Sequence, residues 1–203
     1  MHKEIGSCGD NAVATLQANV AIPEGMTQEG YYHVECRDKD GNLKWEEQVP
    51  NLVVAVGKQL MLDTLLRTSG TYTTVGPYLG LTKVSLTPAA TDTMTTLVTT
   101  NAAEFVNYTV GGSAVRGTAV FGASSSSGST PSNVTTSTAT AITYTITGAG
   151  GTVYGCFLVT GSGAVSTQSS TAGTLYSEGN FATAKTTTAG DTVSVTYSTT
   201  ATS

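Results

Sequence analysis

Alternation of apolar and polar residues runs through most of the chain and predicts β-strands. Residues 31–37 and 43–49 alternate with a period of two, the pattern of a strand with one buried face. Further candidate strands follow residue 70 and are separated by Gly, Ser and Thr: 78–86, 93–100, 104–110, 115–122, 139–147, 152–160, 173–181 and 191–199. Short strands at this spacing are typical of a β-sandwich or a jelly roll. The sequence therefore predicts a mainly β, jelly-roll-like domain.

The stretch "DKDG", residues 38–41, is compatible with a calcium loop or with a hairpin turn. An EF-hand loop requires Gly at its sixth position and Glu at its twelfth. Counted from Asp38, these positions hold Leu43 and Val49, so two required features are missing. Gly41 supplies the positive φ that a tight loop needs. We therefore interpret this stretch as the turn of a β-hairpin.

A four-residue loop at 38–41 fixes the register of that hairpin. It predicts four cross-strand pairs, Val34–Trp45, Cys36–Leu43, Glu35–Lys44 and His33–Glu46. A two-residue turn would instead place Glu35 opposite Glu46, and like charges that face each other are unfavourable. The charge pattern therefore favours the four-residue loop, with Leu43 and Trp45 on the apolar face and Glu47 as the exception there.

Residues 50–70 carry the pattern of an α-helix. Apolar side chains recur at steps of three and four, at Leu52, Val53, Val56, Leu60, Met61 and Leu65. Pro50 and Asn51 stand where helices begin, and Ser69 and Gly70 where they end. Gly57 costs about 1 kcal/mol relative to alanine, which suggests close packing against the hairpin. We expect the apolar stripe to face the core.

Charge divides the 203 residues into a charged front and a nearly neutral back. Residues 1–67 carry six of the nine Lys and Arg residues and ten of the fourteen Asp and Glu residues. We expect an extended N-terminal arm at 1–30, the hairpin and helix at 31–70, and a β-sandwich at 71–203. Residues 31–203 should form one folded unit, with a flexible loop at 122–133.

Composition argues against several classes of function. The net charge is −5 and the sequence lacks a basic cluster, which disfavours nucleic-acid binding. No apolar run reaches the ~18 residues of a membrane span, and the first residues do not resemble a signal peptide. We expect synthesis in a cytoplasm and no contact with nucleic acid or membrane.

Catalytic groups are scarce, and we predict that the protein is not an enzyme. The two histidines, His2 and His33, lie in the arm and on the polar face of the hairpin, where His33 would partner Glu46. The back of the chain holds four acids that the sequence scatters singly: Asp92, Glu104, Glu178 and Asp191. A carboxylate pair at glycosidase spacing does not follow from these positions. We expect no catalytic residue, no cofactor and no metal, and turnover by the purified protein would revive a hydrolase.

The three cysteines are neither a metal motif nor a disulfide framework. Cys36 and Cys156 lie in apolar alternation and should pack as small hydrophobic side chains. Cys8 lies in the polar stretch "GSCGD" and is either a free thiol or the site of an intermolecular disulfide within an assembly.

Four stretches give the chain a resemblance to a known family. They are "RDKDGNLKWEEQVPNLVVAVGKQLMLDTLL", "YLGL", "AATDTMTT" and "GTLYSEGNFATAKTTTAGDTVSVTY". Over roughly residues 31–110 and 150–200 the chain resembles a family of tailed-bacteriophage virion proteins, of the head-decoration or minor capsid type and sometimes labelled tail fibre. The resemblance implies a structural role in the virion and supplies no catalytic residues.

We therefore expect a capsid decoration, or cement, protein that stabilises the head lattice. Its partners would be the major capsid protein and further copies of itself in a trimer, at the capsid surface of the virion. Binding only to the assembled shell stabilises that shell by mass action, and a trimer multiplies weak contacts. The alternative is a tail, collar or head-fibre component that binds a glycan on the host surface.

Overall fold

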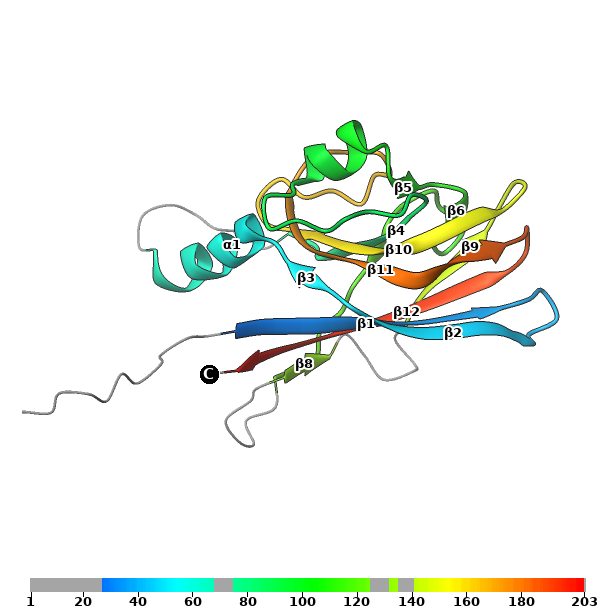
Figure 1. The fold of residues 1–203 in the computed structure, drawn as a ribbon, viewed down its shortest axis with the longest axis horizontal. Helices are drawn as coiled ribbons and strands as arrows, with labels where there is room; N and C mark the ends of the chain where they lie inside the picture. The colour runs from blue at the N-terminus through cyan, green and yellow to red at the C-terminus, as the bar shows by residue number, and fades with distance from the viewer. Residues whose placement is uncertain (1–26, 68–74, 125–131, 135–140, 203) are drawn as a thin grey trace, which may run out of the picture.

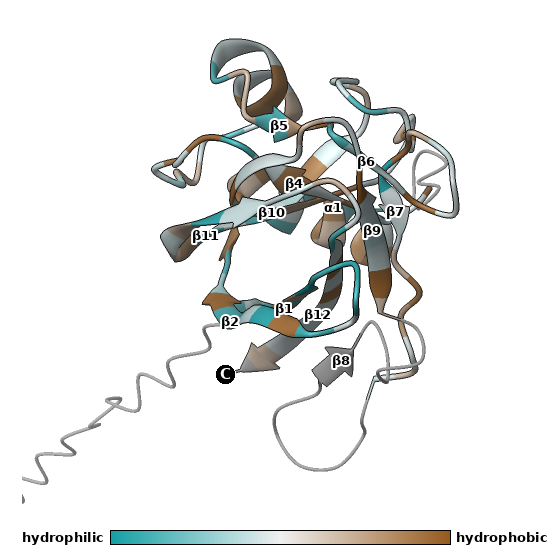
Figure 2. Ribbon diagram, turned by 90° about the vertical axis from the view of Figure 1, so that its right-hand side faces the viewer, coloured by the Kyte–Doolittle hydropathy of each residue, from teal (hydrophilic) through white to brown (hydrophobic). Residues whose placement is uncertain are grey.

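Two antiparallel sheets packed face to face make up the fold, as the computed structural model shows for residues 27–67, 75–124, 132–134 and 141–202 (Figures 1 and 2). The first sheet has the order β2-β1-β12-β9-β6, with β8 paired to β12. Its strands are β1 (Thr27–Arg37), β2 (Leu43–Pro50), β6 (Tyr108–Thr109), β8 (Ser132–Val134), β9 (Ile142–Ile146) and β12 (Thr192–Thr202). The predicted β-sandwich is confirmed.

The second sheet has the order β3-β11-β10-β4-β5, with β7 paired to β4. Its strands are β3 (Leu52–Val53), β4 (Tyr78–Thr82), β5 (Glu104–Phe105), β7 (Gly117–Thr118), β10 (Gly151–Thr160) and β11 (Thr174–Thr187). The chain passes from the second sheet to the first twice, within residues 104–110 and within residues 173–199. In this way β5 and β6 lie in different sheets, and so do β11 and β12.

The first and last described strands hold the first sheet together. β1 and β12 pair without interruption from Thr27–Thr202 to Arg37–Thr192. Because β1 also pairs with β2, the expected hairpin is an integral part of the sandwich. Thr27 to Gly30 belong to this ladder, so the end of the expected arm 1–30 is sheet, and residues 1–26 lie outside the described part of the chain.

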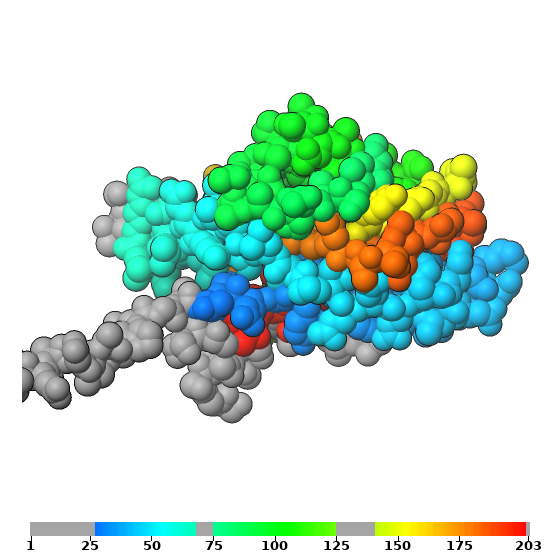
Figure 3. Space-filling view, viewed as in Figure 1, coloured from blue at the N-terminus to red at the C-terminus, as the bar shows by residue number. Residues whose placement is uncertain are grey.

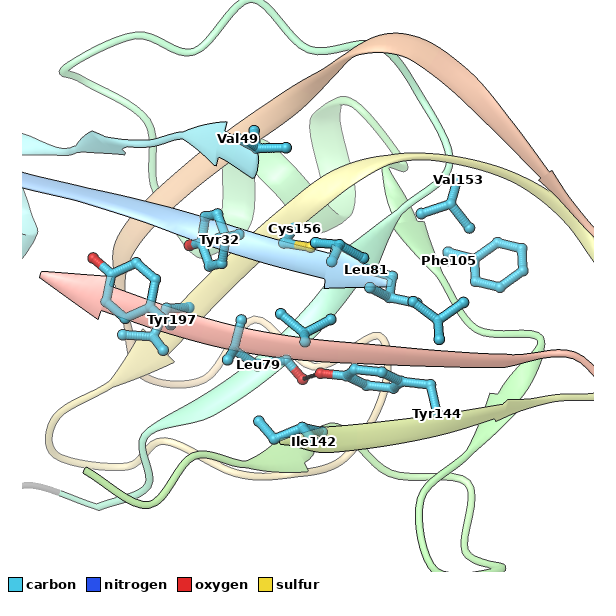
Figure 4. Packing of buried hydrophobic residues seen from close by; sticks show 14 of the residues in the cluster. Tyr32, Val49, Leu79, Leu81, Phe105, Ile142, Tyr144, Val153, Cys156 and Tyr197 are labelled. Carbon is cyan, nitrogen blue, oxygen red and sulfur yellow. Dashed lines mark hydrogen bonds between the residues drawn. The ribbon is translucent and has the colours of Figure 1, made fainter. Parts of the chain in front are cut away.

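Tyrosines fill much of the space between the sheets and hydrogen-bond across it. The Tyr32 hydroxyl on β1 lies 2.7 Å from Ser177 Oγ on β11. The Tyr144 hydroxyl on β9 donates to the carbonyl oxygen of Leu79 on β4 at 2.8 Å (Figure 4). Tyr197 packs against Tyr32 with ring centroids 4.8 Å apart. A buried tyrosine needs a partner for its hydroxyl, and here the partner is on the facing sheet.

Replacing Tyr144 by phenylalanine is expected to lower the free energy of unfolding by about 1 to 2 kcal/mol, because the buried Leu79 carbonyl loses its donor. Urea unfolding at neutral pH measures the change. Tyr31→Phe is the matched control, since Tyr31 is exposed, and it should leave the stability within about 0.5 kcal/mol of the wild type. Equal losses in the two variants would contradict the role of the cross-sheet bond.

The second sheet is buried on both faces, which explains the unbroken apolar run of β10. Cys156 and Leu158 point into the space between the sheets. Phe157 and Val159 point the other way, into a second cluster with Met94, Leu97 and Leu175. The segment 83–103 therefore forms a third, partial layer over this sheet.

Part of that layer is helical where the sequence predicts a strand. Residues 93–100 were expected to be extended, but Thr96–Thr100 form one turn of π-helix, η1. Met94 and Leu97 are spaced by three and are both buried, which is a helical pattern, and Thr93 Oγ1 accepts a hydrogen bond from the backbone N–H of Thr96 at 3.2 Å. The run of threonines raises strand propensity, but the burial of one side of this turn decides its structure.

The helix α1 (Ala55–Leu66) starts later and packs differently from the prediction. Leu52 and Val53 form β3 beside β11 rather than the first turn. Gly57 is the buried residue of the helix, and a Cβ there would lie 2.6 Å from the carbonyl oxygen of Tyr176. The close contact is thus with β11 and not with the hairpin. Leu65 is 82% exposed, so the expectation that the apolar stripe faces the core is wrong for the C-terminal half of the helix.

The hairpin register also differs from the prediction. Cys36 lies opposite Trp45 and Glu35 opposite Glu46, with a bulge at Lys44. This register brings the Trp45 ring to 5.6 Å from the Phe181 ring on β11. Packing against the other sheet thus outweighs the cross-strand charge pairs, each worth about 0.2 to 1 kcal/mol. Leu43, predicted to lie on the apolar face, is half exposed.

Candidate functional site

The single arginine of residues 71–203 lies in a buried ion pair. Arg116, just before β7, is 1% exposed, and Glu104 on β5 is 4% exposed. Arg116 Nε and Nη2 donate to the two carboxylate oxygens of Glu104 at 2.8 and 2.7 Å. The backbone N–H of Ser169 donates to Glu104 at 2.9 Å, and Arg116 Nη2 also donates to the Ser170 carbonyl at 2.7 Å. This bidentate pair fastens the loop 161–173 to the sheet.

Asp191 and Asp38 are likewise used within the fold. Lys44 Nζ lies 2.5 Å from Asp191 Oδ2. Burial opposes ionisation of Asp191, but the hydrogen bonds from Lys44 and Thr188 outweigh it and lower the pKa of this carboxyl. Asp38 Oδ1 accepts the backbone N–H groups of Asp40 and Asn42, both at 2.9 Å. The stretch 38–41 is therefore a hairpin turn whose acid binds the turn's own backbone.

Glu178 and Asp92 contradict the expectation that the four acids stand singly. Glu178 on β11 is 1% exposed. Burial, followed by a hydrogen bond with Asp92 and the charge of that group, raises the pKa of Glu178 to about 8. Asp92 also accepts the backbone N–H of Ala89 at 2.7 Å. A buried carboxyl with a raised pKa beside a second carboxyl is a feature of some catalytic sites. Here Glu178 is enclosed between β11 and the segment 83–103, which shields its carboxyl from solvent.

The two described cysteines and His33 also make contacts within the fold. Cys36 and Cys156 are free thiols buried in the core, as predicted. Burial, with a contribution from the charge of Asp191, raises the pKa of Cys36 to about 11, so this thiol is not activated. His33 Nε2 lies 2.6 Å from Glu46 Oε1 at the surface, so the predicted contact is present, although His33 lies opposite Gln48 and not opposite Glu46 in the ladder. Cys8 and His2 lie outside the described residues.

One group of surface features lies at the end of the sandwich where β1 begins and β12 ends. A hollow of about 620 Å³ is lined there by Glu29, Gly30, Tyr31, Gln48, Pro50, Asn51 and Thr200, and we call it the arm-end hollow. Its lining combines neutral hydrogen-bonding groups, one carboxylate and the half-exposed ring of Tyr31. Asn51 Nδ2 donates to the Tyr197 hydroxyl at 2.7 Å, which ties the hollow to the core. Such a lining suits recognition of a polar surface.

The helix α1 stands beside this end of the molecule (Figure 3). Its C-terminal half carries Leu60, Met61, Leu62, Leu65 and Leu66, which we call the apolar α1 face. Leu62 is 51% exposed and Leu66 70%. Clustered exposed leucines on one short helix are typical of a contact surface. Residues 1–26 join the fold at Thr27, between the arm-end hollow and this face.

The outward face of the first sheet is polar. On β9 and β12 it carries hydroxyl side chains, and Thr143 and Ser194 Oγ atoms lie 3.3 Å apart there. On β1 and β2 it carries His33, Glu35 and Glu46. This face therefore offers hydroxyls on β9 and β12 and charged groups on β1 and β2.

The chain matches no protein-family model, no curated protein and no solved structure. None of the helices in the described ranges is long and apolar enough to cross a membrane. Within those same ranges, no three His, Cys, Asp or Glu side chains gather as they would around a metal ion. The surface at the arm end, with its hollow and the exposed leucines of α1, is the candidate site.

Proposed function

We propose that this protein is a non-enzymatic structural component of a tailed-phage virion, a decoration protein that binds the capsid lattice and stabilises the head. The resemblance of residues 31–110 and 150–200 to that family motivates the proposal. The observation that carries it is the arm end itself. Exposed leucines of α1 and the arm-end hollow flank the point where residues 1–26 join the sheet. A protein that adheres to a lattice needs such contact groups and no reactive ones.

The disposition of the charged groups supports the same proposal. Four buried or partly buried charges form ion pairs inside the fold, Arg116 with Glu104 and Lys44 with Asp191. The exposed sheet face offers hydroxyls, which can form many weak hydrogen bonds with another protein. Weak contacts become strong when copies act together, and a trimer on the head surface would supply that multiplicity. The major capsid protein is the proposed partner, and the capsid surface the proposed location.

Deleting residues 1–26 is expected to weaken binding to purified heads at least tenfold, because the arm would reach neighbouring capsid subunits. The deletion should stop at Met26, since Thr27 already pairs with Thr202. Co-sedimentation with heads that lack the protein measures the binding, and circular dichroism reports whether the sandwich persists. Full-length Ala12→Ser, which changes one small side chain of the arm, is the matched control and should bind normally. A truncated protein that coats heads with unchanged affinity would contradict the role of the arm.

A second candidate function, glycan binding by a tail, collar or head-fibre component, is favoured by Tyr31. Its ring is 40% exposed in the arm-end hollow, beside the amides Gln48 and Asn51. Sugars bind to an aromatic face flanked by hydrogen-bonding groups. Under this alternative, Tyr31→Ala would abolish binding to host polysaccharide, whereas under the leading proposal the wild type binds no polysaccharide.

A further inference from the structure

The apolar α1 face exposes more clustered apolar surface than is usual for a helix in contact with water. Leu62, Leu65 and Leu66 are 51%, 82% and 70% exposed, and they follow one another within five residues. The N-terminal half of the same helix packs so closely on β11 that Gly57 leaves no room for a side chain. The helix is therefore fixed in place with one apolar side uncovered. Contiguous apolar surface of this kind marks a contact site.

Two hollows adjoin this face and meet at Met61. The first, of about 350 Å³, has a lining with no polar surface, formed by Leu60, Met61, Thr64, Leu65, Thr160 and Tyr176. The second, of about 260 Å³, is lined by Gln28, Lys58, Met61 and Leu62. Both lie beside α1 and share Met61 in their lining, and we call the two hollows together the groove of α1. Gln28 is the second described residue of the chain, so residues 1–26 join the fold at the mouth of this groove.

The sequence of the arm supplies matching side chains. The stretch "NAVATLQANVAI", residues 11–22, carries its larger apolar side chains at Val13, Leu16, Val20 and Ile22. Between Ile22 and Thr27 the chain spans at most about 17 Å when extended. The 12-residue helix α1 is about 18 Å long. The arm can therefore reach the whole groove from its own point of attachment.

We propose that residues 11–22 of the arm cover the apolar α1 face of the same molecule when the protein is free of the capsid. Val13, Leu16 and Val20 would contact the leucines of α1. Glu24 would lie near Lys58, whose ammonium makes no ion pair with any residue that the structure describes. A tethered segment acts at an effective concentration in the millimolar range, which favours its own helix over that of a second copy.

This inference concerns the free protein and goes beyond the proposed function. Covering the groove would keep separate copies from associating through exposed leucines. A partner that binds the arm would uncover them. The experiments on the free protein contain no capsid. A negative result in them would overturn the covering of α1 and would leave the decoration proposal untouched, because that proposal is tested by binding to heads.

Hydrogen exchange in the full-length protein tests the inference. In Leu16→Ser/Val20→Ser, exchange of the backbone amides of residues 60–66 should rise at least tenfold over the wild type. Ala12→Ser/Ala18→Ser is the matched control, since it changes two small side chains of the same stretch, and should leave that exchange unchanged. Circular dichroism and exchange of β10 report whether each variant is folded. Equal protection of α1 in all three proteins would overturn the proposal.

A crosslinking experiment with mixed isotopes identifies the occupant. Equal amounts of ¹⁴N- and ¹⁵N-labelled protein are treated with a carbodiimide, which joins a carboxylate to a lysine in direct contact. We expect a Glu24–Lys58 crosslink in which both peptides carry the same label. Mixed labels, or a mass that rises with concentration, would assign the groove to a second copy and overturn the proposal. Absence of the crosslink in the wild type would also count against it.

Discussion

Replacing Arg116 by methionine is expected to lower the free energy of unfolding by about 3 to 5 kcal/mol. The change removes the guanidinium that binds both carboxylate oxygens of Glu104 and leaves that carboxylate buried, 4% exposed, without its counter-charge. The Ser170 carbonyl also loses its donor. Removing one member of a buried ion pair is costly because the remaining charge stays out of water. Denaturation by urea at neutral pH measures the effect.

Lys39→Met is the matched control for this prediction. Lys39 Nζ contacts Asp40 at 2.9 Å, but both side chains are exposed. An exposed pair contributes at most about 1 kcal/mol, so the control should remain close to the wild type. The double variant Arg116→Met/Glu104→Met should recover part of the loss, since it leaves no buried charge. A cost below about 1 kcal/mol for Arg116→Met would mean that the pair does not hold the loop 161–173.

Replacing Glu178 by glutamine is expected to stabilise the protein at pH 8 and above. The pKa of Glu178 is raised from 4.5 in the unfolded chain to about 8 in the folded protein, first by burial and then by Asp92. The folded state therefore binds more protons than the unfolded state between these two pH values. Stability contributed by the protonated carboxyl is complete below about pH 4.5 and is lost as the pH rises through about 8. The total change is on the order of 5 kcal/mol.

Glutamine keeps the hydrogen-bond donor toward Asp92 and cannot ionise. We expect the difference in unfolding free energy, variant minus wild type, to grow from near zero at pH 4.5 to a few kcal/mol at pH 9. Urea titrations at several pH values measure this difference. Glu46→Gln, at the surface beside His33, is the control and should show no such trend. A difference that does not change between pH 5 and pH 9 would contradict the raised pKa of Glu178.

The alternation of apolar and polar residues predicted the sandwich well where strands have one face in the core. On β9 and β12, Ile142, Tyr144 and Val195 point inward and the threonines between them point outward. The pattern failed where tertiary contacts decide the structure. The stretch 93–100 reads as a strand because of its threonines, yet Met94 and Leu97 bury one side of a helical turn.

The candidate site was harder to predict because its parts meet only in three dimensions. The apolar residues of α1 are visible in the sequence, but Gly57 makes the closest contact with the sheet, and Leu62, Leu65 and Leu66 are exposed. The sequence does contain an indication of the pair between Arg116 and Glu104. A lone arginine, with two lysines and four acids in an otherwise uncharged stretch of 136 residues, is a candidate for a buried pair. The contact of Glu178 with Asp92 had no signal, since it depends on how the segment 83–103 folds over β11.

The copy number of this protein in purified virions tests the decoration proposal most directly. Densitometry of a stained gel, calibrated against the major capsid protein, gives the ratio of the two chains. We expect copies in fixed proportion to the capsid subunits, and we expect heads that have lost their tails to retain the protein. A handful to a few dozen copies, lost together with the tail or neck, would contradict it.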